Sequence, residues 1–203
     1  MENNITKEEI KKLIAVPGKV RGQVFVTDLE YVREKQGGTG IILLKNRMAE
    51  FDSPIDYDKI EISEWYPIGL RAVSLLVIKD VFGFSDNEIR EMGNSAPKFS
   101  FVVKNLMKYF LSPEKGFKES PKYWPKHYTV GRLEDVEYSE EKKHYIYRLH
   151  DFKIHPIFCT YLMDDGYFLR IGQYSRKSQE MHSRETKCEF KGDPYHECII
   201  EWK

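Results

Sequence analysis

Two cysteines and one histidine near the C-terminus are the residues whose types and spacing best suit metal chemistry. Cys188 and Cys198 lie on either side of a Gly192-Asp193-Pro194 turn, and His196 follows that turn. If the flanking segments are neighbouring antiparallel strands, both thiols and the imidazole can reach one zinc ion, because zinc favours such ligands. Cys188, His196 and Cys198 are therefore the candidate zinc ligands. The alternative is that both cysteines are small core residues.

Side-chain alternation along the last predicted strand bears on one of these ligands. Cys198 is in phase with Ile200 and Trp202, and residues in phase share one face of a strand. We expect that face to point toward the helices. This parity favours a core position for Cys198.

Cysteine also permits covalent catalysis. A thiolate activated by a nearby histidine is a nucleophile, and Cys159 and Cys198 are the candidates. The sequence contains no HExxH, Walker, GxGxxG or GxSxG motif and no kinase motif set, so it gives no support to the enzyme classes that those motifs mark. Asp164 and Asp165 are adjacent in a predicted helix and point apart, so they do not form a catalytic carboxylate pair.

Composition limits the class of protein. The chain has 203 residues, equal numbers of basic and acidic side chains (32 each) and 41% hydrophobic residues. Zero net charge gives no long-range attraction to nucleic acid. The most apolar stretch, Leu70–Phe84, is interrupted by charged side chains and the N-terminus lacks a signal-peptide pattern. With an odd count of three cysteines, we expect a single cytoplasmic domain over residues 1–203 without a membrane span.

Helices are predicted for most of residues 1–127. Thr6 and Glu9 have the spacing of a capping box, which marks a helix start. Pro67–Phe82 is apolar on most faces and is expected to be a buried central helix. The other predicted helices end near Ile14 or span Thr27–Gly37, Ile41–Met48, a segment from Ser85, and Phe99–Leu111.

In residues 128–203 the spacing of apolar side chains changes from the helical pattern to the two-residue alternation of β-strands. Tyr128–Tyr138 and Lys143–Leu149 form a predicted hairpin. A helix runs from His155 to Ile171, with strain expected near Gly166, and Glu180–Phe190 and Glu197–Trp202 form a second hairpin. Strands joined by hairpins are antiparallel. We therefore expect an α+β fold, with a helical layer packed on one face of a roughly four-stranded antiparallel sheet formed by the C-terminal half.

The C-terminal segment resembles a known domain. Glu185, Cys188, Gly192-Asp193-Pro194, Cys198 and Trp202 follow a pattern similar to the end of the 4-vinyl reductase domain. That domain is similar in fold to TRAPP transport-particle subunits and to haem–nitric oxide binding domains. Weaker matches to bacterial proteins of this superfamily extend the resemblance through the N-terminal half, at Arg21–Phe25, Tyr31–Glu34, Gly37-Gly38 and Glu64–Pro67.

The resemblance implies a pocket between the helices and the sheet that accepts an apolar small molecule. Aromatic residues and a few polar groups agree with this, since such walls are typical of ligand pockets. The alternative is that the aromatic rings simply fill a core. The candidate pocket residues are Tyr109, Phe110, Trp124, His127, Tyr128, Phe158, Tyr161 and Phe168.

Haem binding is not expected, because the sequence lacks the haem-binding pattern of these relatives. The haem-binding relatives use an axial histidine and a Tyr-x-Ser-x-Arg clamp, whereas Tyr174-Ser175-Arg176 has the wrong spacing. His127 and His155 are the histidines to test as axial ligands. The sequence has no nicotinamide or flavin motif, so we do not carry over a reductase activity.

These observations predict a non-enzymatic sensory or regulatory domain that binds an apolar or aromatic effector and acts through a separate signalling protein or a homodimer mate. One alternative is a TRAPP-like assembly scaffold without a ligand. Others are a metal- or haem-binding sensor and an enzyme with a reactive cysteine. No nucleic-acid partner is expected.

Overall fold

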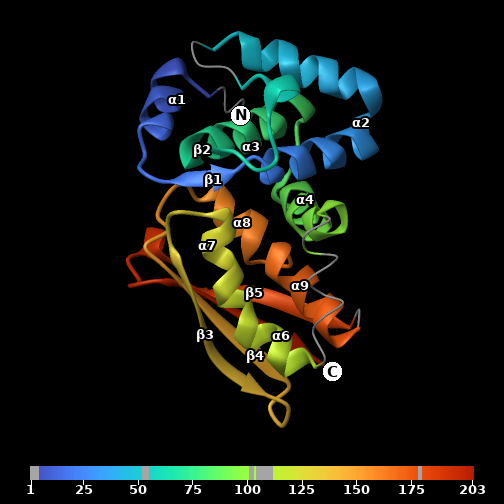
Figure 1. The fold of residues 1–203 in the computed structure, drawn as a ribbon, viewed down its shortest axis with the longest axis vertical. Coiled ribbons are helices and arrows are strands. Elements are labelled where there is room, and N and C mark those ends of the chain that lie inside the picture. Colours follow the sequence, from blue (N-terminus) through green and yellow to red (C-terminus); the bar gives the residue numbers. More distant parts are fainter. Residues whose placement is uncertain (1–4, 52–54, 101–102, 104–111, 178–179) are drawn as a thin grey trace.

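The computed structural model describes residues 5–51, 55–100, 103, 112–177 and 180–203. The N-terminal helices lie at one end of the molecule, and a four-stranded sheet with its own helices lies at the other end (Figure 1). None of the helices in this described part combines the length and the apolar character of a membrane span.

Local signals explain where the N-terminal helices begin. The first helix starts with the predicted capping box, in which the Thr6 hydroxyl accepts from the Glu9 amide and Glu9 accepts from the Thr6 amide. Ser85 and Glu88 form a second capping box, which starts α4. The elements of this half are α1 (Lys7–Ile14), β1 (Lys19–Arg21), α2 (Gln23–Ala49), the 3-10 turn η1 (Tyr57–Lys59), β2 (Trp65–Pro67), α3 (Ile68–Phe82) and α4 (Asp86–Phe99).

Helix α2 differs from its prediction. The sequence predicts two helices separated at Gly37-Gly38, but α2 is one element with a kink at Gly37, where φ is 66° and ψ is −168°. Glycine adopts positive φ without the steric cost that other residues incur. The predicted break is therefore a bend inside one helix.

Helix α3 is the centre of the N-terminal half, as its composition predicts. Most of its side chains are buried, and among them is the charged Arg71. It contacts both α1 and α2 and ends at Gly83, whose φ is 61°. A helix buried on most faces has no free face for docking a partner.

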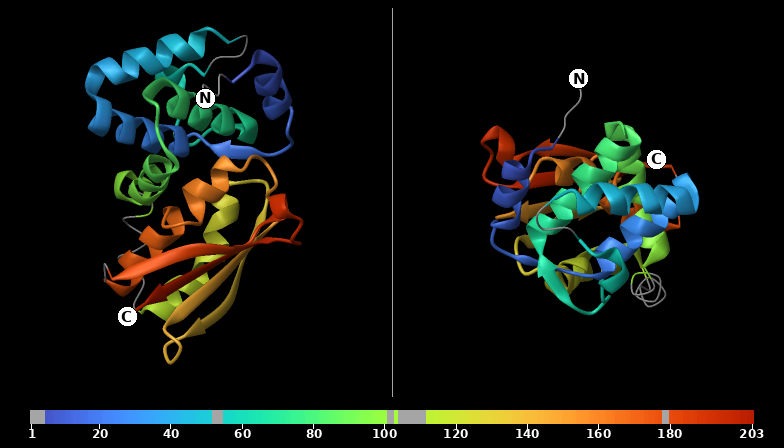
Figure 2. Two further views of the ribbon diagram at one scale, coloured as in Figure 1. Left: turned by 180° about the vertical axis from the view of Figure 1, so that it is seen from behind. Right: turned by 90° about the horizontal axis from the view of Figure 1, so that it is seen from above.

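The C-terminal half confirms the predicted α+β architecture. Its sheet has the order β3-β4-β6-β5, and every neighbouring pair is antiparallel. Tyr145, Tyr147 and Leu149 on β4 and Cys198 on β6 are buried against the helices, whereas the alternate residues are more exposed. The left view of Figure 2 shows the sheet and its helices from behind. The elements are α6 (Pro113–Glu119), η2 (Ser120–Tyr123), α7 (Trp124–His127), β3 (Arg132–Ser139), β4 (His144–His150), α8 (Ile157–Leu162), α9 (Tyr167–Arg176), β5 (Met181–Lys187), η3 (Glu189–Lys191) and β6 (His196–Trp202).

The helix predicted from His155 to Ile171 is divided in two. Helix α8 ends at Leu162 and α9 begins at Tyr167, with Gly166 as its N-cap residue. A β-carbon on Gly166 would lie 2.2 Å from the Tyr161 carbonyl oxygen, so the chain can turn back there only with glycine. The predicted strain near Gly166 is thus a tight turn between two short helices.

Backbone pairing joins the two halves. Strands β1 and β2 form a small antiparallel sheet in the N-terminal half, and Val20 of β1 also forms a β-bridge with Tyr128. The Lys19 carbonyl accepts from the Thr129 amide at 2.9 Å. The segment that follows α7 is therefore fixed to the N-terminal half.

Candidate functional site: a junction cavity and a cysteine–histidine cluster

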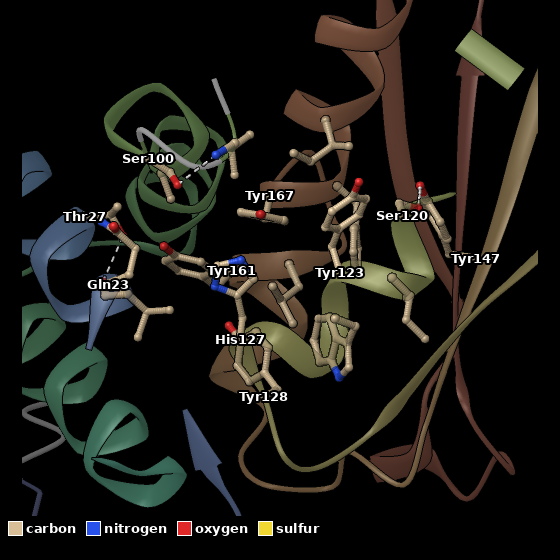
Figure 3. A pocket seen from close by; sticks show the side chains of 18 of the residues that line it. Gln23, Thr27, Ser100, Ser120, Tyr123, His127, Tyr128, Tyr147, Tyr161 and Tyr167 are labelled. Carbon is tan, nitrogen blue, oxygen red and sulfur yellow. Dashed lines mark hydrogen bonds between the residues drawn. The ribbon is translucent and has the colours of Figure 1, made fainter. Parts of the chain in front are cut away.

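A cavity, here called the junction cavity, lies where the two halves meet. Its wall includes Gln23 and Thr27 on α2, Arg71 on α3, Tyr161 on α8 and Tyr167 on α9 (Figure 3). Its free volume is about 100 Å³. That volume accommodates several water molecules or a small organic molecule, and is smaller than the roughly 300–1,000 Å³ of sites for drug-sized ligands.

Most of the described pocket candidates lie on this wall. The structure places Trp124, His127, Tyr128, Tyr161 and Phe168 around the junction cavity. The candidate Phe158 is buried behind it, where its ring contacts Phe152 and Arg71. The candidates Tyr109 and Phe110 lie outside the described residues.

A buried ionic network borders the cavity, and two of its members, Asp28 and Arg71, are not among the candidates predicted from the sequence. The Tyr161 hydroxyl donates to Asp28 Oδ1 at 2.7 Å, and Arg71 Nε lies 3.4 Å from Asp28 Oδ2. Arg71 also donates to the Tyr128 hydroxyl. Burial raises the pKa of Asp28, and the charge of Arg71 opposes that rise. The network (Asp28, Arg71, Tyr128, Tyr161) links α2 and α3 to α8 and to the segment after α7.

His127 supplies the cavity with a neutral nitrogen base. Of the six histidines, all of which the structure describes, only His127 lines the cavity. Burial and the nearby charges of Arg21 and Arg71 lower its pKa. A neutral imidazole keeps a lone pair for a metal or a hydrogen-bond donor. His155 lies before α8 instead, where its Nδ1 accepts from the Ile157 amide at 3.1 Å.

The second site is a cluster of four potential metal ligands. One donor atom from each of Cys159, Glu185, Cys188 and His196 lies within 4.8 Å of the others. Cys159 Sγ is 3.9 Å from Cys188 Sγ and 3.7 Å from His196 Nδ1, and that nitrogen is 2.9 Å from Glu185 Oε1. We call these residues the cysteine–histidine cluster.

The donor set of the cluster fits a divalent transition metal. Two thiolates, one imidazole and one carboxylate are ligand types that zinc binds, and together they supply the four ligands of a four-coordinate zinc site. Burial raises the pKa of the Cys159 thiol, and the Glu185 carboxylate adds to the rise. A bound cation reverses this effect, because it stabilises the thiolate.

The structure brings together two of the three predicted zinc ligands and replaces the third. Cys188 and His196 belong to the cluster, but Cys198 does not. Cys198 pairs with Glu185 across β5 and β6, and its Sγ lies 3.6 Å from the Met163 carbonyl oxygen, under the helices. Strand parity predicts this orientation of Cys198.

Helix α8 belongs to both sites. Its Cys159 lies in the cysteine–histidine cluster, while its Tyr161 and Leu162 line the junction cavity. Within this six-residue helix, only two positions along the chain separate Cys159 of the candidate metal centre from Tyr161 of the candidate ligand site.

Comparisons with known proteins identify the fold. No family model and no curated protein sequence matches the chain. Among solved structures, an H-NOX protein from Shewanella oneidensis in its Fe(II)NO state is 12% identical, with a TM-score of 0.67 over 90% of this chain and 99% of that one. A mutant H-NOX protein from K. algicida, in its unliganded Fe(II) state, is 13% identical, with a TM-score of 0.59 over 90% and 96%. At such identities the likeness establishes the H-NOX fold.

The comparisons contradict the expectation that excluded haem. Another similar solved structure is described by the modulation of haem redox potential through protein-induced porphyrin distortion. It is 12% identical to this chain, with a TM-score of 0.62 over 90% of this chain and 99% of that one. Arg176 of the Tyr174-Ser175-Arg176 segment forms an ion pair with Glu140 on the β3–β4 hairpin. Tyr128 and Arg132 have the Tyr-x-x-x-Arg spacing, with Val130 at the serine position.

Proposed function

We propose that this chain is a small-molecule sensing domain and that the junction cavity is its ligand site. One observation carries the proposal: residues of both halves line the same cavity, and the buried ionic network crosses between them at its wall. A ligand that prefers one arrangement of this wall shifts the packing of the two halves. A signalling protein or a second copy of the chain would respond to that change.

Haem is the first ligand to test, because the fold neighbours are H-NOX proteins. His127, which lines the cavity, would hold the iron, and bound haem would supply a site for a diatomic gas. Haem is larger than the free volume of about 100 Å³, so its entry requires the wall to open. An apolar or aromatic effector of smaller size fits the present volume better, and remains the alternative ligand.

Haem titration distinguishes these two ligands. Hemin would be added to the purified full chain and to the variants His127→Ala and His155→Ala, and the Soret absorption band would be recorded. Haem binding at the junction cavity predicts a one-to-one complex with the parent chain and with His155→Ala, and its loss in His127→Ala. No saturable band in any of the three proteins eliminates haem.

Native mass spectrometry then addresses the smaller effector. A stoichiometric small molecule that remains bound to the full chain supports sensing of that molecule. A chain that carries no small molecule and binds no hemin contradicts the sensing proposal and favours the assembly scaffold.

Burial raises the pKa of the Cys159 and Cys198 thiols, which disfavours an enzyme with a reactive cysteine.

We also propose that the cysteine–histidine cluster binds zinc or a similar divalent metal. The convergence of four suitable donor atoms supports this part of the proposal. Zinc affinity would be measured by competition with a chromophoric chelator. We expect Cys159→Ala to bind zinc at least tenfold more weakly than the parent chain, while Cys198→Ala, a buried cysteine outside the cluster, retains the affinity. Equal loss in both variants contradicts the assignment of these four ligands.

A further inference from the structure

His196 lies between two carboxylates, and only one of them belongs to the cluster. Its Nδ1 faces Glu185 Oε1 at 2.9 Å and Cys159 Sγ at 3.7 Å. On the opposite side of the ring, Nε2 lies 3.3 Å from Glu189 Oε2. This Nε2 is buried and satisfies hydrogen-bond geometry with no described residue. The imidazole thus presents Nδ1 to the cluster and Nε2 to Glu189.

The Glu189 carboxylate is held firmly in place. Its Oε1 accepts from the Asp151 amide at 2.9 Å, and its Oε2 accepts from the Phe152 amide at 3.1 Å. The side chain is only 11% exposed. Two backbone donors stabilise the negative charge at this position. Glu189 is therefore a fixed acceptor beside the outer edge of the His196 ring.

We propose that Glu189 is a positioning residue for the metal centre. This inference rests on the proposed metal binding. When Nδ1 of His196 donates its lone pair to a metal, the ring proton must sit on Nε2, and that N–H needs an acceptor. A small rotation of the ring closes the 3.3 Å contact with Glu189 into a hydrogen bond. Such partners of ligating histidines fix the ring orientation and its tautomer.

Zinc competition on the full chain tests this role. The variant is Glu189→Gln, and the control is Glu201→Gln on β6, whose side chain is 52% exposed. In Glu189→Gln the negative charge is lost, and the new NH2 group would face either the Asp151 N–H or both the Phe152 N–H and the imidazole N–H. We expect zinc affinity to fall by about 10–100-fold, which is typical when such a partner is removed. The control should bind zinc like the parent chain.

Proton–nitrogen NMR of the zinc-loaded chain separates positioning from a structural role. Zinc on Nδ1 leaves the ring proton of His196 on Nε2, and a hydrogen bond to Glu189 should shift this proton downfield and slow its exchange with water. In zinc-loaded Glu189→Gln the proton should move upfield and exchange faster, whereas a variant that is merely less stable would keep the parent signal. Parent-like zinc affinity or a parent-like Nε2 proton in Glu189→Gln overturns this inference alone. Failure of the parent chain to bind zinc overturns the proposed metal binding together with it.

Discussion

Asp28 and Arg71 form an ion pair that is almost fully removed from water, with side-chain exposures of 0% and 2%. Removing one partner of such a pair leaves an uncompensated buried charge, which costs about 3–5 kcal/mol. We therefore expect Asp28→Asn to lower the free energy of unfolding by about that amount. Urea unfolding measures the loss.

A surface pair provides the matched control for this prediction. Lys45 and Asp58 approach more closely, at 2.6 Å, but Asp58 is 74% exposed. Exposed pairs contribute little because water and salt screen them. Asp58→Asn should therefore change stability far less than Asp28→Asn. Similar losses in both variants would mean that burial does not determine the strength of the Asp28–Arg71 pair.

Individual site residues were predictable only where local pattern determines position. Alternation along β6 correctly orients Cys198, and the Cys188–His196 spacing correctly places these two residues in one cluster. Cys159 and Glu185 join them through tertiary packing, which brings α8 against the β5–β6 turn. Arg71 offered a clearer signal, because a charge inside an apolar helix needs a buried partner. The identity of that partner, Asp28, depends on how α2 and α3 pack.

Close backbone contact between α4 and α8 depends on a glycine. A β-carbon at Gly93 would lie 1.9 Å from the Tyr161 carbonyl oxygen. Gly93→Ala must therefore push α8 away from α4, and overpacking of this kind typically costs about 1–3 kcal/mol. We expect a lower free energy of unfolding in urea and, since Tyr161 moves, a weaker ligand complex at the junction cavity.

Gly38→Ala is the control for helical glycines. A β-carbon at Gly38 on α2 meets no atom within 4 Å. The substitution should be neutral or stabilising by up to about 1 kcal/mol, because alanine is the better helix former. If Gly93→Ala were equally benign, α8 would have room to move without loss of packing.

The sequence predicts whether most segments are helices or strands, but it predicts less well how successive elements are connected. Hairpins β3–β4 and β5–β6 follow from alternation and turn residues, and α3 follows from its apolar sequence. The sequence predicts a helix break at Gly37-Gly38 and strain inside a helix near Gly166, where the structure has a kink and a tight turn. A glycine marks a position where the backbone can deviate, but it does not specify whether the helix stops, bends or turns back. The β1–β2 pair joins short segments that are distant in sequence, and three-residue strands carry almost no periodic signal.

At the scale of the whole molecule, two chains of residue contacts connect the cysteine–histidine cluster to the junction cavity. Along α8, Cys159 of the cluster lies two residues before Tyr161 of the cavity wall. Through Glu189, the cluster contacts the backbone of Phe152, whose ring lies 5.4 Å from that of Trp124 at the cavity. Phe152, Trp124 and Tyr161 belong to one contiguous core. We therefore expect binding at one site to alter the free energy of binding at the other, and such an effect is reciprocal.

Metal removal should reveal this coupling without knowledge of the ligand. If the cysteine–histidine cluster binds zinc as proposed, zinc at one hundred times its dissociation constant would stabilise the folded chain by about 2.7 kcal/mol. Hydrogen exchange would compare zinc-loaded with chelator-treated protein. We expect faster exchange after removal at α8 and also at α7, which carries Trp124 and His127. Helix α1 should change least, because it contacts neither site. In Cys159→Ala, which should bind zinc more weakly, zinc should protect α7 and α8 less than in the parent chain. Changes confined to the β5–β6 turn would mean that the metal centre stabilises its own surroundings and leaves the cavity unaffected.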